Sequence, residues 1–153
     1  MKPDLILVAN AAAARLYAYS SCERGLLVLD TLHAPESRLH SHELDTGPIG
    51  HERSDSRPGG VMLASRMDAQ HKRQLAFARH LAQRIDTALQ THAYGDVVLF
   101  AACPFLGKVK NALGPDARKA LRDAVPLDLT HFDGDELSRR VNNALRSGVG
   151  NAD

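Results

Sequence analysis

The 153-residue sequence predicts an α/β protein built on a mixed five-stranded sheet. Two apolar runs, residues 5–10 and 97–102, show no polar alternation, which is typical of strands covered on both faces. Between them, apolar residues recur at intervals of three and four over residues 68–92, as on one face of an amphipathic helix. Buried strands that alternate with helices are characteristic of the α/β class.

The N-terminal region predicts a three-stranded antiparallel meander. Its strands are expected at residues 5–10, 14–19 and 26–33, and short turns separate them. The first apolar run resembles a secretion signal, but Asp4, Asn10 and Arg15 interrupt it, so we expect a strand there. No window approaches the ~20 apolar residues of a membrane span, and we expect a cytoplasmic protein that does not contact membranes.

The segment 35–67 shows neither helical nor strand periodicity, and it is rich in proline and glycine. A loop of this length inside a compact domain is usually functional or disordered. Acidic residues outnumber basic ones in it, so it is not a basic arm for nucleic acid.

The second half of the chain predicts helices that alternate with strands. The expected elements are a helix at 68–92, a strand at 97–102, a helix at 104–113 that Pro104 can begin, a helix at 116–123, a strand at 125–132, a helix from about 133, and a flexible tail at 148–153. The order β-β-β-α-β-α-β-α, with right-handed crossovers, is the ribonuclease H-like arrangement. It places the first strand beside the fourth, in one domain over residues 1–147.

Composition excludes several classes of function. The net charge is +1, so no overall field draws the chain to nucleic acid or membrane. Cys22 and Cys103 match no metal spacing, and Cys103 is expected to be a small buried apolar residue.

Metal-dependent nuclease chemistry on this fold needs carboxylates at the carboxyl ends of the central strands. Here the first strand ends in Asn10 and the fourth in Ala102 and Cys103, while Asp4 and Asp96 precede their strands. We therefore expect no metal site, no cofactor and no catalytic residue.

Three weaker features leave alternatives open. His40 and His42 could serve as metal ligands or acid/base groups, or could be solvated loop residues. Lys108 and Lys110 could contact RNA, or could simply lie on the solvent-exposed face of a helix. Phe105, with its neighbour Leu106, could form an exposed apolar lip or fold under the sheet.

Several short motifs together resemble the bacterial host attachment protein family. These are Leu7-Val8-Ala9-Asn10; His33-Ala34-Pro35-Glu36-Ser37-Arg38-Leu39; Ala102-Cys103-Pro104-Phe105-Leu106-Gly107; and Leu127-Asp128-Leu129-Thr130. That family is similar to the middle domain of archaeal and eukaryotic peptide-chain release factors, which implies a release-factor-like fold and a ribosome-linked role. In release factors a Gly-Gly-Gln tip hydrolyses peptidyl-tRNA, whereas the corresponding loop here carries Gly59-Gly60-Val61 without the glutamine.

We therefore predict a translation-associated module that binds RNA or the ribosome. Its candidate binding residues are Asn10, Arg15, Glu36, Arg38, His40, His42, Gly59, Gly60, Pro104, Phe105, Lys108 and Lys110. The alternatives are a hydrolase acting on peptidyl-tRNA or another RNA-linked ester, and a protein-interaction module in attachment or stress signalling. The edge of the meander could also form a homodimer.

Overall fold

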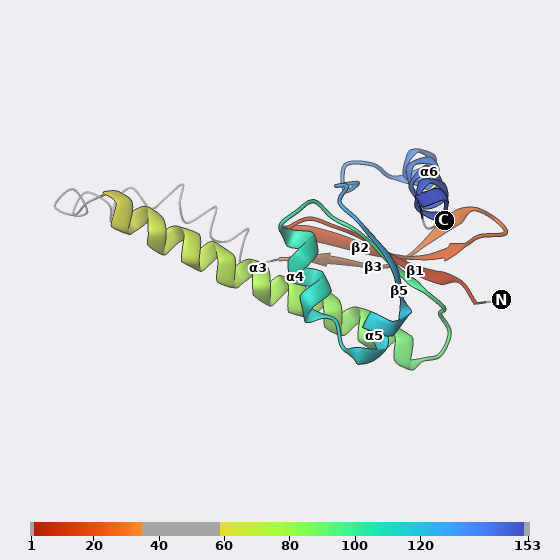
Figure 1. Ribbon diagram of the computed structural model, residues 1–153, viewed down its shortest axis with the longest axis horizontal. Coiled ribbons are helices and arrows are strands. Elements are labelled where there is room, and N and C mark those ends of the chain that lie inside the picture. Colours follow the sequence, from red (N-terminus) through yellow and green to blue (C-terminus); the bar gives the residue numbers. More distant parts are fainter. Residues whose placement is uncertain (1, 35–58, 152–153) are drawn as a thin grey trace.

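The structure, a computed structural model, describes residues 2–34 and 59–151 (Figure 1). Its elements are β1 (Asp4–Ala9), β2 (Ala13–Ser20), β3 (Gly25–His33), α3 (Gly59–Gln90), β4 (Val97–Phe100), α4 (Phe105–Ala112), α5 (Pro115–Ala120), β5 (Leu121–Val125) and α6 (Gly134–Asn151). The three strands of the meander and the fourth strand lie where the sequence predicted them, to within two residues at each end.

The five strands form one open, mixed sheet in the order β3-β2-β1-β4-β5. β1 pairs antiparallel with β2 and parallel with β4, and β4 pairs parallel with β5. The predicted mixed five-stranded sheet, with the first strand beside the fourth, is therefore confirmed. Because β1 and β4 are parallel, Asn10 and the residues after Phe100 emerge at the same carboxyl edge of the sheet.

Helices cover both faces of the sheet: α3, α4 and α5 lie on one face, and α6 lies on the other (Figure 1). The strand period of two sorts the apolar side chains between these layers. Leu5 and Leu7 of β1 belong to the core beneath α3, whereas Ile6 and Val8 belong to the core beneath α6. This division explains why β1 is apolar at every position from Leu5 to Ala9.

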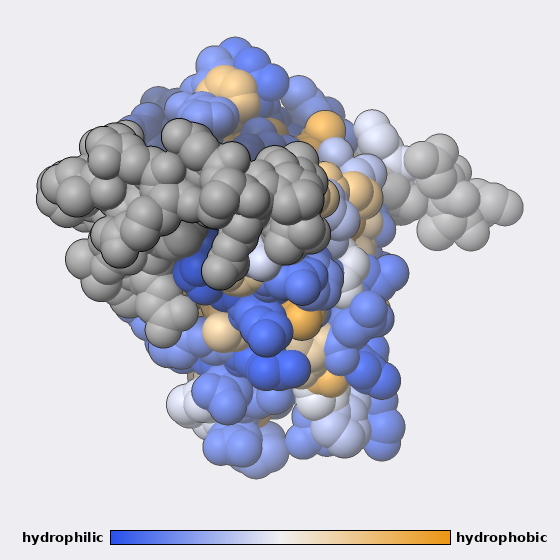
Figure 2. Space-filling view, turned by 90° about the vertical axis from the view of Figure 1, so that its left-hand side faces the viewer, coloured by the Kyte–Doolittle hydropathy of each residue, from blue (hydrophilic) through white to orange (hydrophobic). Residues whose placement is uncertain are grey.

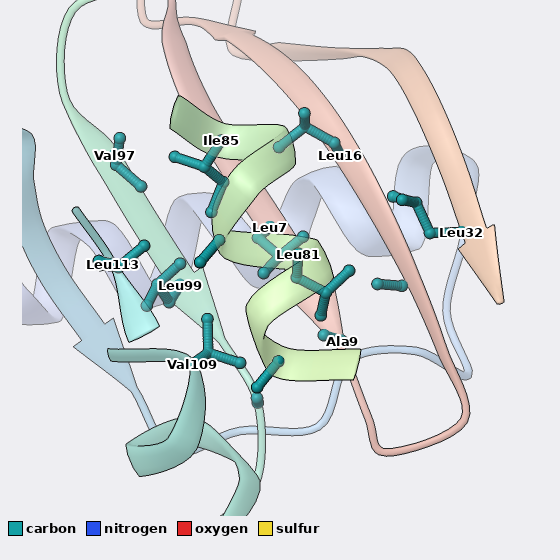
Figure 3. Packing of buried hydrophobic residues seen from close by; sticks show 14 of the residues in the cluster. Leu7, Ala9, Leu16, Leu32, Leu81, Ile85, Val97, Leu99, Val109 and Leu113 are labelled. Carbon is teal, nitrogen blue, oxygen red and sulfur yellow. The ribbon is translucent and has the colours of Figure 1, made fainter. Parts of the chain in front are cut away.

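The larger core lies between the sheet and α3. Leu81 and Ile85 of α3 are fully buried and lie among Leu7 and Leu99 of the central strands (Figure 3). Beside them, the rings of Phe77 on α3 and Phe105 on α4 stack with centroids 6.0 Å apart. Phe105 and Leu106 are buried, which confirms the interpretation that they fold inward.

Three elements differ from the sequence predictions. The last strand is Leu121–Val125, not 125–132, because Pro126 has no N–H to donate to the ladder and the chain turns away after Val125. The helix expected at 116–123 accordingly ends at Ala120. α6 continues to Asn151, into the stretch that was predicted as a tail.

The long helix begins at Gly59 rather than at residue 68, so Gly59 and Gly60 lie in its first turn and not in a loop. Cys103 is exposed, so the prediction of a buried cysteine is wrong. The reason is that β4 ends at Phe100 and residues 102–104 turn outward into solvent. Within residues 2–34 and 59–151, no helix is long and apolar enough to cross a membrane.

Candidate nucleic-acid interface

Asn10 follows β1 at the carboxyl edge of the sheet, where its side chain organises the turn into β2. Its Oδ1 accepts hydrogen bonds from the backbone N–H groups of Ala12 and Ala13, both at 2.8 Å. Its Nδ2 donates to Oγ1 of Thr130 at 3.1 Å, and that hydroxyl donates to Oδ1 of Asp128 at 2.5 Å. Asn10 therefore joins the β1–β2 turn to the segment that follows β5.

Arg15 of β2 holds the same segment from the other side. Its Nη2 donates to the carbonyl oxygens of Thr130, at 2.9 Å, and Phe132, at 2.7 Å. The guanidinium also lies 5.8 Å from the ring centroid of Tyr17. Burial raises the pKa of the Tyr17 phenol, an effect that Arg15 opposes and the carboxylate of Asp133 reinforces.

The polar groups of Asn10 and Arg15 are thus engaged within the chain. Charge-assisted hydrogen bonds to two carbonyls fix the Arg15 side chain in one position. The observed role of this pair is to anchor the segment at residues 128–132, which carries one of the motifs that the sequence singled out. To bind a ligand, Asn10 or Arg15 would have to break these intramolecular hydrogen bonds and form new ones to the ligand.

Four more predicted residues lie around the start of α4. Pro104 is the residue before the helix, and its peptide bond to Cys103 is cis. Phe105 is buried in the core, so its ring is not on the surface. Lys108 Nζ donates to Oε1 of Gln74 on α3 at 2.5 Å, and Lys110 is exposed. Lys108 therefore lies where α4 packs beside α3, whereas Lys110 lies on another side of α4 and is open to solvent.

The adjoining part of α3 carries further cations. Arg66, Lys72 and Arg79 are exposed, and Arg73 is partly exposed. Together with Lys108 and Lys110 they make up what we call the α3–α4 cationic surface, defined by Arg66, Lys72, Arg73, Arg79, Lys108 and Lys110, which extends over more than one side of the two helices. Figure 1 shows this half of α3 projecting well beyond the sheet, and Figure 2, viewed from that end, shows mostly hydrophilic side chains on the described surface.

The sequence singled out Lys108 and Lys110 but not the cations of α3. Arg66 and Arg73, and likewise Lys72 and Arg79, are seven residues apart, so they form two stripes along the helix that resemble an ordinary solvated face. The docking of α4 against α3, with Lys108 bonded to Gln74, places the two sets on neighbouring helices. A count of charges over residues 65–80 would have been the available signal.

Other predicted site residues are not brought to this surface by described contacts. Glu36, Arg38, His40 and His42 lie outside the described residues. Gly59 and Gly60 form the first turn of α3, at the far end of its projecting half. Among the described residues, no group of three or more His, Cys, Asp or Glu side chains could hold a metal ion.

A family model described as "Protein required for attachment to host cells" (Host_attach) matches residues 5–141. The match runs from β1 into α6 and so includes every strand of the sheet. The chain belongs to this family. The Host_attach description suggests a role in attachment to host cells, and the predicted membership of the host attachment family is confirmed. No curated protein shows a significant match to the chain.

Proposed function

We propose that this member of the Host_attach family is a non-enzymatic RNA-binding module that acts in the cytoplasm on the translation machinery. The proposal includes a ribonuclease H-like fold related to the release-factor middle domain. The α3–α4 cationic surface is the binding element. Attachment to host cells would then depend on this protein indirectly, through the synthesis of other proteins.

The separation of charge along the chain is the observation that carries the proposal. Residues 65–80 and 105–112 contain six basic side chains and one acidic side chain, a net charge of +5. The whole chain carries only +1, so the remaining residues carry −4. A basic surface on an otherwise acidic protein is the electrostatic footprint of a phosphate-binding site.

The shape of the α3–α4 surface favours contacts to phosphates over base reading. α3 has 32 residues, which corresponds to a rod about 48 Å long. Its cations occupy more than one side of the rod, so they can meet several stretches of RNA backbone. Because contacts to phosphates carry no sequence information, we expect recognition of the backbone rather than of the sequence.

The resemblance to release factors supports a site on the ribosome. In those proteins the catalytic tip precedes the long helix, and here Gly59-Gly60-Val61 begins α3. The missing glutamine favours binding without peptidyl-tRNA hydrolysis. The projecting half of α3 would then be the part that reaches into ribosomal RNA.

Co-sedimentation with purified ribosomes across a salt series tests this function. We expect association at 50 mM salt that falls steeply toward 300 mM, because binding to phosphates releases counterions. Equal amounts of protein in the pellet at both salt concentrations, or no protein in the pellet at 50 mM salt, would contradict the proposal.

A second candidate function, self-association through β3, is favoured by one specific observation. β3 is an edge strand, and Leu27 and Val28 on it are 66% and 55% exposed. Exposed apolar residues on an open edge are typical of strand pairing between chains. We expect light scattering to show a dimer whose dissociation constant rises at least tenfold in Leu27→Lys, whereas a monomer at 100 µM would rule this pairing out.

A further inference from the structure

A cavity of about 720 Å³ lies at the amino edge of the sheet, opposite the end from which α3 projects. The starts of β1, β4 and β5, the turn between β2 and β3, and the middle of α6 surround it. Its volume is within the range of small-molecule sites, which is roughly 300–1,000 Å³. The proposed RNA-binding surface uses none of its residues.

Positive charge dominates the lining of this cavity. Lys2, Arg24, Arg122 and Arg146 contribute four positive charges, and Asp4 and Asp96 contribute two negative charges. The net charge of +2 matches a dianion. Lys2 comes from the N-terminal strand region, Arg24 from a turn and Arg146 from α6, so the cations approach from three sides.

The two carboxylates are already occupied by Arg122. Its Nη1 lies 3.3 Å from Oδ2 of Asp4 and 3.6 Å from Oδ2 of Asp96. Asp4 Oδ1 also accepts the backbone N–H of Asp96 at 3.0 Å. In the described part of the chain, Lys2, Arg24 and Arg146 have no carboxylate within ion-pair distance, and these exposed side chains line the cavity.

Neutral groups complete the wall. The Tyr19 hydroxyl donates a short hydrogen bond to Oδ1 of Asn142, whose Nδ2 donates to the carbonyl of Arg24 at 3.3 Å. These bonds tie β2, the turn and α6 together, which holds the Arg24 backbone in a fixed position. Leu145 adds an apolar surface beside the polar groups.

We propose that this cavity binds a small phosphate monoester. A phosphate monoester carries close to two negative charges above pH 7, and its three oxygens accept hydrogen bonds from several cations at once. Tyr19, Asn142 and Leu145 would contact the organic part of the molecule. The site is independent of RNA binding and would couple the protein to a small metabolite.

Isothermal titration with ribose 5-phosphate as the probe tests the site, with ribose as the uncharged control. We expect saturable binding of ribose 5-phosphate with a dissociation constant below 1 mM, and no binding of ribose. Arg146→Gln should weaken binding about 3- to 10-fold, since it removes one charge from a partly solvated site. Arg139→Gln, on the same helix but outside the cavity, should leave it unchanged.

A second variant, expected to tighten binding, separates a loss of the site from a loss of folding. Asp96 is about half exposed, and Asp96→Asn raises the net charge of the cavity to +3. It should bind ribose 5-phosphate about 3- to 10-fold more tightly than the natural chain. The proposal is overturned if Asp96→Asn weakens binding or leaves it unchanged, if Arg139→Gln and Arg146→Gln lose the same affinity, or if no saturable binding appears at 10 mM probe.

Discussion

Neutralising three cations of the α3–α4 surface should reduce both RNA affinity and its salt dependence by a calculable amount. The variant combines Lys72→Gln, Arg79→Gln and Lys110→Gln, which all change exposed side chains. If each of the six cations of the surface neutralises one phosphate of single-stranded RNA, log K falls with log salt at a slope of about −4. Removing three contacts should change this slope to about −2.

The same relation gives the loss of affinity. Three lost contacts, each with a slope of about −0.7, correspond to roughly 50-fold weaker binding at 0.15 M salt. Fluorescence anisotropy with a labelled RNA of about 20 nucleotides measures both quantities, provided that each protein is titrated at four or more salt concentrations.

A matched control removes the same charge from elsewhere on the protein. Arg118→Gln, Lys119→Gln and Arg139→Gln also change exposed residues, but these lie on α5 and α6. This control should keep a slope near −4 and lose less than threefold in affinity. Equal losses in the two triple variants would refute the reasoning, because binding would then follow net charge and not the α3–α4 surface.

Three further predictions concern the fold. Ile85→Ala empties a fully buried site beneath α3 and should lower the free energy of unfolding by about 2–5 kcal/mol in urea denaturation. Arg15→Gln removes charged hydrogen bonds to two carbonyls and should cost about 1–3 kcal/mol in the same assay, with faster hydrogen exchange over residues 128–132; unchanged exchange there would contradict the anchoring role. The hydrogen bond from Arg84 lowers the pKa of Asp30 below 3.8, so this pair stabilises the fold above pH 3.8 and the contribution disappears as pH falls through the lowered value. Asp30→Asn should therefore lose at most about 1 kcal/mol at pH 7, and this loss should shrink as pH falls below 3.8, whereas a loss that does not change with pH would contradict this assignment.

The central strands were predictable because a strand that is buried on both faces appears in the sequence as a continuous apolar run. β1 and β4 are apolar at nearly every position, and two cores, one on each face, require this. The meander followed from short strands with turn residues between them. Parallel pairing of β1 with β4 followed from the long helix between them.

The prediction placed β5 at residues 125–132 instead of Leu121–Val125, because the later segment looks more like a strand in the sequence. Residues 127–130 alternate between apolar and polar, yet Leu129 is buried as part of an irregular segment beside α6. The actual strand contains Arg122 and Asp123, which an edge strand tolerates because one side of it stays accessible. Local alternation cannot distinguish these two cases.

The start of α3 and the α3–α4 surface were missed for a related reason. Gly59 and Gly60 disfavour a helix locally, but residues 62–67 are mostly good helix formers and extend it toward them. The cations of α3 come to lie on a helix next to that of Lys108 and Lys110 only through tertiary packing. The cavity at the amino edge likewise joins residues from both ends of the chain, such as Lys2 and Arg146.

Ultraviolet cross-linking of the protein to ribosomes, followed by mass spectrometry of the RNA-linked peptides, tests the binding surface most directly. Our account predicts that cross-linked peptides come from residues 65–80 and 105–112 and disappear in the Lys72, Arg79 and Lys110 triple variant. Cross-links confined to the edge strand β3 or to α6, and unaffected by that variant, would contradict it.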